Sequence, residues 1–304
     1  MGVDNPLISV IVPAFNASTY IGEALTSIVH QTHKNWEIIV IDDGSTDATI
    51  DVLSGYASNI RLIKQNNKGP AAARNLGAKS ARGEWLAFLD ADDTWAPDKL
   101  ARQLLDVGKA NWSYTDMLFK GGVNDGLRDS EFTEKHEGEV LEKLVLGNFI
   151  STSTVLIRRR SFEESGGFDE SLPSIEDWEL WTRIASNNPV SYVNEPLTRY
   201  RVHPSSTSRK TRKTLPNHLR VIDIIFSRVG TTPEIQKLKP RAKATSCGIC
   251  SYIAEEEGDA SFAFLCAFHA CRFQPFSSSR WMRLLKAALK WPLIRFRTPR
   301  SPDQ

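Results

Sequence analysis

The first half of the chain alternates short apolar runs, rich in β-branched residues, with stretches whose apolar residues recur at helical spacing. Residues 8–12 form the first run, which Pro13 stops, and Ile21, Leu25 and Ile28 then recur every three or four residues. This alternation is typical of βαβ units, which build a mostly parallel, Rossmann-like central sheet. The same pattern predicts strands at 37–41, 60–64 and 85–89, a helix through Leu53 capped by Ser45 or Thr46, and helices opening at Gly69-Pro70 and Pro97.

The second half of the chain has a less regular pattern. It predicts a strand at 112–119, a polar glycine-rich loop to about residue 138, a short helix, a β-branched strand-like run at 151–157 and an edge strand at 197–202. Beyond Thr207 the chain becomes helical and basic, and the Ser and Thr residues near Pro204 are typical of a linker at 205–215. We therefore predict an α/β domain at 1–207 and an α-helical C-terminal region at 208–304.

Composition is that of a globular protein. The 304 residues are 41% hydrophobic and 24% charged, and no apolar stretch approaches the ~18 residues of a membrane-spanning helix. Residues 1–6 carry neither the basic nor the apolar part of a secretory signal, so the expected location is the cytoplasm, with peripheral contact at the inner face of the membrane left open. The four cysteines all follow residue 240, where their spacing favours packing over a zinc site or a disulfide framework.

The net charge of +2 hides an asymmetry, because basic residues concentrate toward the C-terminus. From Arg280 onward seven Lys and Arg residues stand against one acidic residue, Asp303, and they are interleaved with Trp and Leu. Two interpretations stay open: a helix lying on an anionic membrane, or a helix packed on the catalytic domain with a solvated basic face. Nucleic acid is disfavoured as a partner, since RNA- and DNA-binding motifs are absent from the sequence and the predicted cleft is acidic.

Polar residues follow three of the predicted strands at the points where the strands end. They lie at 15–16, at 42–43 and in the acidic run 90–93. In an open α/β sheet the ligand site lies beyond the carboxyl ends of the strands, so we expect these residues to converge. Carboxylates repel a diphosphate unless a divalent cation lies between them, and therefore the acidic run indicates a metal site. For such a run taken alone, a solvated turn before the next helix is the alternative.

Seven sequence segments, in order, resemble the family 2 glycosyltransferases, whose catalytic domain has the GT-A fold. The segments are VIVPAFN at 10–16, VIDDGSTD at 40–47, GPAAARN at 69–75, GEWLAFLDADD at 83–93, GGFDE at 166–170, EDW at 176–178 and YRVH at 200–203. The resemblance covers about two thirds of the chain, and the order of the segments makes it specific. It implies a GT-A catalytic domain followed by the α-helical C-terminal region.

The resemblance implies a site for a nucleotide-sugar donor and a divalent cation. The residues implied on the donor side are Pro13, Phe15, Asn16, Asp43, Arg74 and Asp90. Phe15 would pack against the base, and Asp43 would accept a hydrogen bond from its edge. Asp92 and His203 would bind Mn²⁺ or Mg²⁺, with contact between a protonated His203 and the diphosphate as the alternative. Taken alone, Asp43 also suits a helix-capping turn and Arg74 a surface ion pair.

The resemblance also implies a catalytic base. Inversion at the sugar carbon requires a group opposite the leaving diphosphate that takes the proton of the acceptor hydroxyl, and Asp177 holds the matching position. Glu176 is the second choice, and on spacing alone both acids equally suit the positive end of a helix dipole. Trp178 either lines the acceptor pocket or belongs to the core.

These features predict an inverting, metal-dependent glycosyltransferase of hexosyltransferase type, acting in polysaccharide, glycolipid or other surface glycan synthesis. The acceptor would be a glycan or lipid-linked hydroxyl. The Gln-x-x-Arg-Trp signature of processive family members is absent from the sequence, which favours a single addition. A nucleotidyltransferase would need a triphosphate loop rich in Gly and Lys after the first strand. A non-catalytic sugar-nucleotide-binding or membrane-binding module is the other alternative.

Overall fold

The computed structural model describes residues 5–108, 110–203 and 211–295, with the backbone alone for 291–295. The chain divides into two compact units. The first consists of Met1–Leu144 and Asn148–His203, and the second of Val145–Gly147 and Pro204–Gln304. The boundary expected after residue 207, and most of the expected linker, lie at 204–210, outside the described residues, so that boundary stays a prediction.

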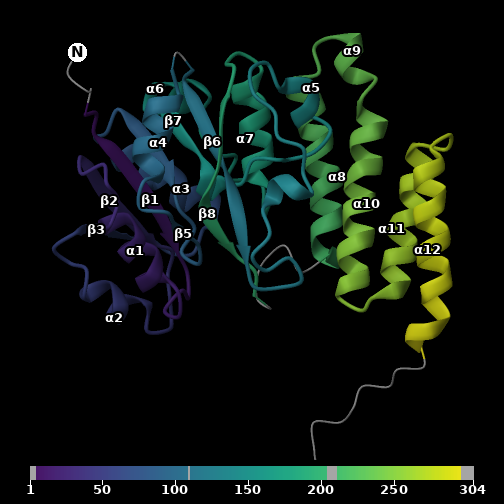
Figure 1. Cartoon of the computed structure of the whole chain (residues 1–304), viewed down its shortest axis with the longest axis horizontal. Helices are drawn as coiled ribbons and strands as arrows, with labels where there is room; N and C mark the ends of the chain where they lie inside the picture. Colours follow the sequence, from purple (N-terminus) through teal and green to yellow (C-terminus); the bar gives the residue numbers. More distant parts are fainter. Residues whose placement is uncertain (1–4, 109, 204–210, 296–304) are drawn as a thin grey trace, which may run out of the picture. The chain divides into compact units, whose positions relative to one another are not determined.

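The first unit is built on an eight-stranded sheet, counted over the residues that the structure describes (Figure 1). Its strand order is β3 (Ile60–Lys64), β2 (Trp36–Asp42), β1 (Ile8–Ala14), β4 (Trp85–Phe88), β7 (Leu156–Arg158), β6 (Trp112–Lys120), β8 (Ser191–Arg201) and β5 (Thr94–Trp95). The four strands from β3 to β4 are parallel, whereas β7 is antiparallel to both of its neighbours. The α/β class is therefore confirmed, with a sheet that is mixed beyond β4.

Helices cover both faces of this sheet. They are α1 (Ile21–Val29), α2 (Thr49–Ser54), α3 (Pro70–Ser80), α4 (Lys99–Asp106), α5 (Leu141–Leu144), α6 (Arg159–Glu164) and α7 (Glu176–Ala185). Strand β1 shows why both faces are covered: Val10 and Val12 pack in one buried cluster with residues of α1, and Ile11 in another with residues of α3 and α7. Strands buried on both faces read as continuous apolar runs, as residues 8–12 do.

Three local predictions are corrected by the structure. Neither Ser45 nor Thr46 caps α2, because Asp47 Oδ1 accepts the amide of Thr49 at 3.0 Å instead. The run at 151–157 is not one strand, since the 3₁₀ turn Thr152–Thr154 precedes β7. The strand expected at 197–202 is the second half of β8, and it is not an edge strand where the short β5 pairs with it.

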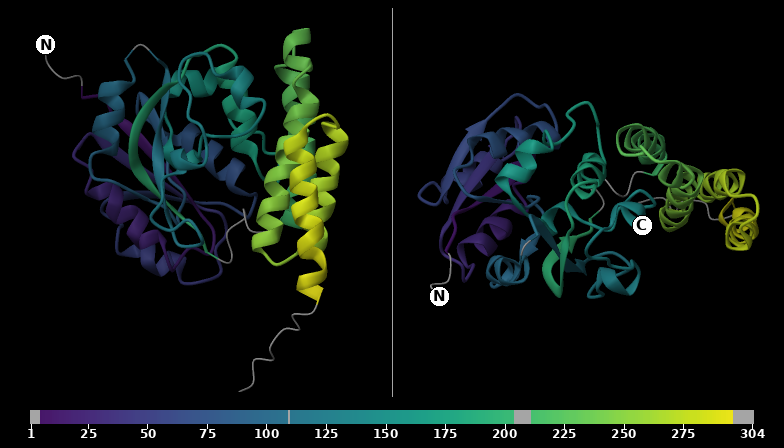
Figure 2. Two further views of the ribbon diagram at one scale, coloured as in Figure 1. Left: turned by 45° about the vertical axis from the view of Figure 1, so that its right-hand side comes forward. Right: turned by 90° about the horizontal axis from the view of Figure 1, so that it is seen from above.

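The second unit is helical among its described residues. It contains α8 (Thr211–Arg228), α9 (Pro233–Gln236), α10 (Lys239–Glu256), α11 (Ala260–Phe273) and α12 (Ser278–Arg295). Helices α10, α11 and α12 lie side by side in every view (Figure 2). Cys247, Cys250 and Cys266 are buried in an apolar core formed by residues of α8, α10 and α11, which agrees with the packing interpretation of the cysteines. None of the helices over the described ranges is long and apolar enough to cross a membrane.

Candidate active site

The carboxyl ends of β1 and β2 bring two of the predicted donor-side segments together. The last residue of β1, Ala14, pairs with Asp42, and its carbonyl accepts the amide of Asp43 at 2.8 Å. Asn16 has a positive φ of 48°, and its Oδ1 accepts the amide of Thr46 at 2.8 Å. The side chain of Phe15 is half exposed beside this junction. An exposed aromatic ring on a braced loop is suited to packing against a planar base.

Asp43 connects the end of β2 to the loop that opens α3. Its carboxylate accepts the amides of Lys68 and Gly69, both at 2.8 Å, and the side-chain amide of Gln65 at 2.7 Å. The residue is only 4% exposed. Oδ1 receives two of these bonds and Oδ2 one, so a lone pair on Oδ2 is left for a donor from a bound base. The structure thus gives Asp43 a bracing role that is compatible with the predicted binding role.

Arg74 joins the acidic run to the start of α7. Its Nη2 lies 2.6 Å from Asp90 Oδ1, and its Nη1 lies 2.6 Å from Glu176 Oε1. The guanidinium is buried, and the two carboxylates raise its pKa above the ordinary value. Arg74 therefore reaches two acidic residues of the candidate site and is not a surface ion-pair partner. A charge buried between two carboxylates fixes their separation, because moving either would leave it unpaired.

The acidic run after β4 contains residues with different surroundings. Asp93 is 1% exposed, and it accepts the hydroxyl of Ser153 at 2.6 Å and the amide of Arg201 at 2.9 Å. It therefore anchors the turn to β8 and is shielded from solvent. Asp90 and Asp92 keep side chains that are about one third exposed. These two are left to meet a ligand.

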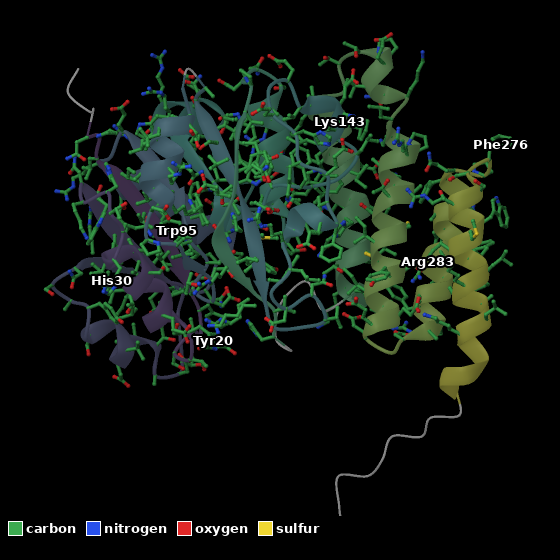
Figure 3. The ribbon with its side chains drawn as sticks, viewed as in Figure 1. Tyr20, His30, Trp95, Lys143, Phe276 and Arg283 are labelled. Carbon is green, nitrogen blue, oxygen red and sulfur yellow. The ribbon has the colours of Figure 1, made fainter. Side chains whose placement is uncertain are left out.

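Asp92 and His203 form the candidate metal position. Asp92 Oδ2 lies 3.0 Å from His203 Nε2, and the ring of His203 packs 5.1 Å from that of Tyr20, which is labelled in Figure 3. Burial and the charge of Asp90 raise the pKa of Asp92, so this carboxylate lacks a full positive counter-charge. Oxygen and imidazole ligands around an under-compensated negative charge fit Mn²⁺ or Mg²⁺. Among the described residues no group of three or more His, Cys, Asp or Glu side chains could hold a metal, so further ligands would have to come from a diphosphate and water.

Asp177 lies at the first turn of α7, on the other side of Arg74 from the acidic run. Its Oδ1 accepts the amide of Trp178 at 2.7 Å, and its Oδ2 accepts Asn148 Nδ2 at 3.2 Å and Thr152 Oγ1 at 3.3 Å. Burial, with the charge of Glu176, raises its pKa to about 6, although Arg74 opposes the shift. A carboxylate with a pKa near 6 is ionised at neutral pH and still accepts a proton readily, as a general base must.

The comparison with known proteins agrees with this geometry. The family model described as Glycosyl transferase family 2 matches residues 9–166, which is more than half of the chain. The chain belongs to glycosyltransferase family 2.

The relatives of this chain within the family differ in how much of their length the match spans. Bacillus subtilis TuaG, whose name assigns it to teichuronic acid biosynthesis, is 33% identical over 211 residues, 67% of this chain and 82% of TuaG. An uncharacterised glycosyltransferase of Rickettsia typhi is 31% identical over 73% of this chain and 71% of its own length. One from Rickettsia felis is 37% identical over 64% of this chain, and the match spans only 33% of that protein.

Solved structures share the fold at low identity. Residues 1–349 of Staphylococcus aureus TarS, in complex with UDP-GlcNAc, align with a TM-score of 0.63 at 19% identity, over 94% of this chain and 91% of that one. The mannosyltransferase PcManGT of Pyrobaculum calidifontis, in complex with GDP-Man and Mn²⁺, aligns with a TM-score of 0.58 at 22% identity, over 94% and 86%. These likenesses confirm the GT-A fold.

Two predicted acceptor residues of this chain are not open to solvent. Glu176 is 6% exposed and its carboxylate is engaged by Arg74. Trp178 is 1% exposed, and its Nε1 donates to the carbonyl of Leu144 at 2.6 Å. The geometry thus favours the core interpretation for Trp178, because a fully buried indole presents no surface to an acceptor.

The sequence pattern did not predict that the segment at 148–154, which precedes β7, contacts Asp177 and Asp93. Asn148 and Thr152 both donate to Asp177 Oδ2, and Ser153 donates to Asp93 Oδ2. The available signal was a run of Ser and Thr in a stretch that otherwise reads as a strand. A β-branched run with hydroxyls on consecutive residues suits a polar turn as well as a strand.

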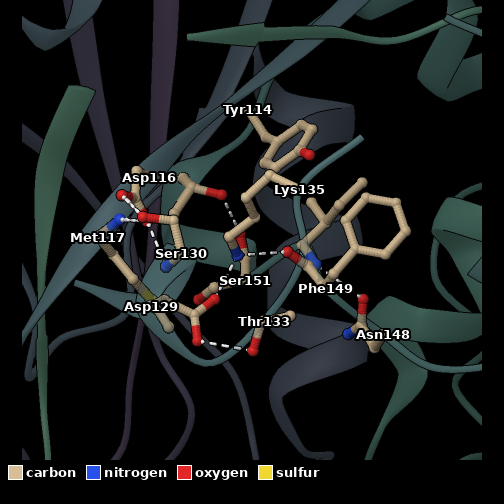
Figure 4. Close-up of polar contacts among 12 residues, drawn as sticks. Tyr114, Asp116, Met117, Asp129, Ser130, Thr133, Lys135, Asn148, Phe149 and Ser151 are labelled. Carbon is tan, nitrogen blue, oxygen red and sulfur yellow. Dashed lines mark hydrogen bonds and ion pairs between the residues drawn. The ribbon is translucent and has the colours of Figure 1, made fainter. Parts of the chain in front are cut away.

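A buried polar network fixes this missed segment (Figure 4). Lys135, whose side chain is 6% exposed, forms an ion pair with Asp129 and donates to the carbonyl of Phe149 at 3.0 Å. Asp116 accepts the hydroxyl of Ser130 at 2.7 Å, which ties the same loop to β6. The loop expected up to residue 138 therefore contacts Phe149 through Lys135 and holds the backbone next to Asn148 in place.

Proposed function

We propose that this protein is an inverting, metal-dependent glycosyltransferase that moves a sugar from a nucleotide-diphosphate sugar to an acceptor hydroxyl. The observation that carries the proposal is the placement of Asp177, with its pKa near 6, across the Arg74 bridge from Asp90. This arrangement puts a proton acceptor on one side of Arg74 and the candidate donor and metal groups on the other. The match covers only 33% of the R. felis relative, so the proposed activity refers to this chain and not to a longer protein of that kind.

On the donor side, Pro13, Phe15, Asn16 and Asp43 would hold the base, and Asp90 the ribose. Support comes from the exposed Phe15 ring, the braced Asn16 loop and the free lone pair of Asp43 Oδ2. TarS and PcManGT were solved with UDP-GlcNAc and with GDP-Man, which makes a nucleotide sugar the natural donor class to test.

Asp92 and His203 would hold Mn²⁺ or Mg²⁺. When bound, the cation would supply Lewis-acid stabilisation of the negative charge that builds on the leaving diphosphate. The chain's own groups prepare the position: Asp93 fixes the turn to β8, and Arg201 Nε donates to the carbonyl of Asp92 at 2.8 Å. Both contacts keep Asp92 pointing toward His203 without competing for its carboxylate.

The proton step is assigned to Asp177. As the acceptor oxygen attacks the sugar carbon from the face opposite the diphosphate, its proton would pass to the Asp177 carboxylate, and direct displacement inverts that carbon. Arg74 engages the carboxylate of Glu176, which leaves Asp177 as the carboxylate of this pair that can accept a proton. The acceptor is proposed to be a hydroxyl of a polysaccharide or lipid-linked surface glycan, in line with the name of TuaG. The cytoplasmic location stays a prediction.

The test is turnover of a nucleotide-sugar panel with Mn²⁺, compared between wild type, Asp177→Asn and Asp51→Asn. Asp51 is an exposed acid on α2 and serves as the matched control. We expect Asp177→Asn to lower kcat by about 10² to 10⁴ while the thermal shift with UDP or GDP is kept. Turnover of Asp177→Asn at the control rate would refute the base assignment. Nucleotide binding by the wild type without any turnover would favour the non-catalytic module instead.

A further inference from the structure

Helix α12 carries arginines on the side that packs against α10. Arg280 Nη2 donates to Thr245 Oγ1 at 3.1 Å, and Arg283 Nη2 donates to the carbonyl of Ser251 at 2.8 Å. Figure 3 shows Arg283 among the helices of this unit. Ala287, one turn further, is buried on the same side. The inner face of α12 thus uses polar residues that have hydrogen-bond partners.

The outer face of α12 carries large apolar residues. Trp281, Met282, Leu285 and Leu289 are 47%, 57%, 63% and 73% exposed. Their spacing of three and four residues places them in one stripe along the helix. Phe276, in the turn before α12, is fully exposed and lies near the upper end of α12 in Figure 3. A helix that faces only water normally carries polar residues on this side, so a continuous apolar stripe indicates a surface with a partner.

The charges around the stripe select the kind of partner. Glu255 of α10 pairs with Arg283 at 2.7 Å and also with Lys290, so this acid is engaged on the inner side. Lys286 is exposed on the outer side, between Met282 and Leu289 in sequence. From residue 260 to the C-terminus the sequence has eight Lys and Arg residues and a single acid. Arg280 and Arg283 face α10, whereas Lys286 and Lys290 are exposed. A second copy of this face would bring these exposed charges together, whereas an anionic lipid surface would attract them.

We propose that the outer face of α12, formed by Trp281, Met282, Leu285, Lys286 and Leu289, docks on an anionic lipid bilayer. The apolar side chains enter the boundary between headgroups and acyl chains, and Lys286 stays at the level of the headgroup phosphates. The indole N–H of Trp281 donates to the carbonyl of Pro275 at 2.7 Å, so the exposed part of the ring is apolar and suits this depth. The surface is separate from the residues proposed for glycosyl transfer, so it would localise the enzyme without taking part in the reaction.

The experiment is flotation of the full chain with phosphatidylcholine vesicles, with and without phosphatidylglycerol. We expect the wild type to float with the phosphatidylglycerol vesicles, to stay unbound with pure phosphatidylcholine, and to be released as salt is raised. The double variant Leu285→Ser/Leu289→Ser should bind these vesicles at least about tenfold more weakly than the wild type. The matched control is Leu105→Ser on α4, a leucine that is 67% exposed in the other unit and should bind as the wild type does.

Further measurements keep the result decisive. If the double variant loses its thermal unfolding transition, Lys286→Glu replaces it, because reversal of an exposed charge on the same face should also weaken binding to anionic vesicles. The proposal is overturned if the wild type does not float with anionic vesicles, or if neither variant weakens flotation. A concentration-dependent dimer that Leu285→Ser/Leu289→Ser abolishes, without vesicle binding, would assign the face to a second copy instead.

Discussion

Asp177 differs from the other carboxylates of the site in what surrounds its two oxygens. Asp93 is buried and fully engaged, and Asp90 is engaged by Arg74, whereas Asp177 Oδ2 has two donors at more than 3 Å. Longer, weaker hydrogen bonds still orient a carboxylate. They also allow one of the two protein donors to be replaced by the hydroxyl group of the sugar acceptor. The contacts from Asn148 and Thr152 therefore tune the proposed base.

Replacing Asn148 by Ala is expected to shift the pH dependence of turnover. Its Nδ2 stabilises the charged form of Asp177, so removal should raise the pKa of Asp177 further above 6 and move the acidic limb of kcat/KM to higher pH. The measurement is a kcat/KM profile from pH 5 to 8 for Asn148→Ala and for Asn187→Ala, an exposed Asn after α7. Coincident profiles for the two variants would show that Asn148 does not act on the base.

Replacing Asp92 by Asn is expected to change the response to metal. Wild type should gain about 5 °C or more in melting temperature with saturating UDP or GDP plus Mn²⁺, and Asp92→Asn should gain much less from the metal. Because burial and Asp90 raise the pKa of Asp92, the variant should also melt higher than wild type without metal. Thermal shift with and without Mn²⁺ measures both effects, and equal metal responses would remove Asp92 as a ligand.

At the scale of elements, the site depends on how closely α3 approaches β1. A Cβ added at Gly77 of α3 would lie 2.5 Å from Ile11 Cγ2, and Ile11 is fully buried. This glycine allows the helix to pack near the sheet, and the helix in turn positions Arg74 between Asp90 and Glu176. A glycine that looks unfavourable inside a helix thus has a packing reason.

Gly77→Ala is expected to lower the free energy of unfolding by about 1–3 kcal/mol, because a new methyl group has no space in the packed core. Gly55→Ala is the matched change, since Gly55 has a helical φ of −65° and an added Cβ there would make only an ordinary contact with Val52 O at 3.4 Å. It should be neutral or slightly stabilising. Urea unfolding of both variants measures the difference. Equal stabilities would mean that α3 can move away from β1 at little cost.

The start of α7 carries backbone strain next to the proposed base. Ile175 has a φ of 65°, a conformation that a β-branched residue rarely adopts, and Glu176 and Asp177 follow directly. Such a residue costs about 1–3 kcal/mol and persists where the surroundings hold it. The Arg74 contact with Glu176 is one such constraint. The strain therefore accompanies the placement of the acid pair.

At the scale of the whole molecule, the buried acids of the site are expected to weaken the fold as pH rises. The pKa of Asp177 is about 6 in the folded protein and near 3.8 in the unfolded chain, so between these values unfolding releases a proton. The free energy of unfolding then falls with rising pH, and this loss is complete above pH 6. Asp92 and Asp93, whose pKa values are also raised, act in the same direction.

Asp177→Asn should therefore be more stable than wild type at pH 8 and close to it at pH 4. Chemical unfolding of both proteins at the two pH values is the measurement, and Asp51→Asn serves again as the control. A stability gain at pH 8 together with lost turnover would show that the ionised Asp177 is needed for the reaction but destabilises the fold. A gain of the same size at pH 4 would contradict a raised pKa as its cause.

The sequence by itself determined the order of elements and the chemistry of the strand ends. The apolar run at 8–12 became strand β1, because a strand buried on both faces requires continuous apolar residues. The segment 60–64 became the edge strand β3, whose residues are partly buried or exposed. The seven family segments predicted the candidate site acids at 43, 90, 92 and 177, since a binding motif is a local pattern. The Gly69-Pro70 pair also predicted the start of α3. Proline suits the first position of a helix, because the amide at that position has no hydrogen-bond partner within the helix.

Only the tertiary structure decided which acids share a neighbour and which are engaged elsewhere. Arg74 and Glu176 are 102 positions apart in sequence, and Asp93 and the Arg201 amide 108 apart, so no local pattern contains either contact. The burial of Trp178 and the outward stripe of α12 depend in the same way on which neighbours cover a side chain. Periodicity gives a helix two faces, but the packing of the other elements decides which face meets the core.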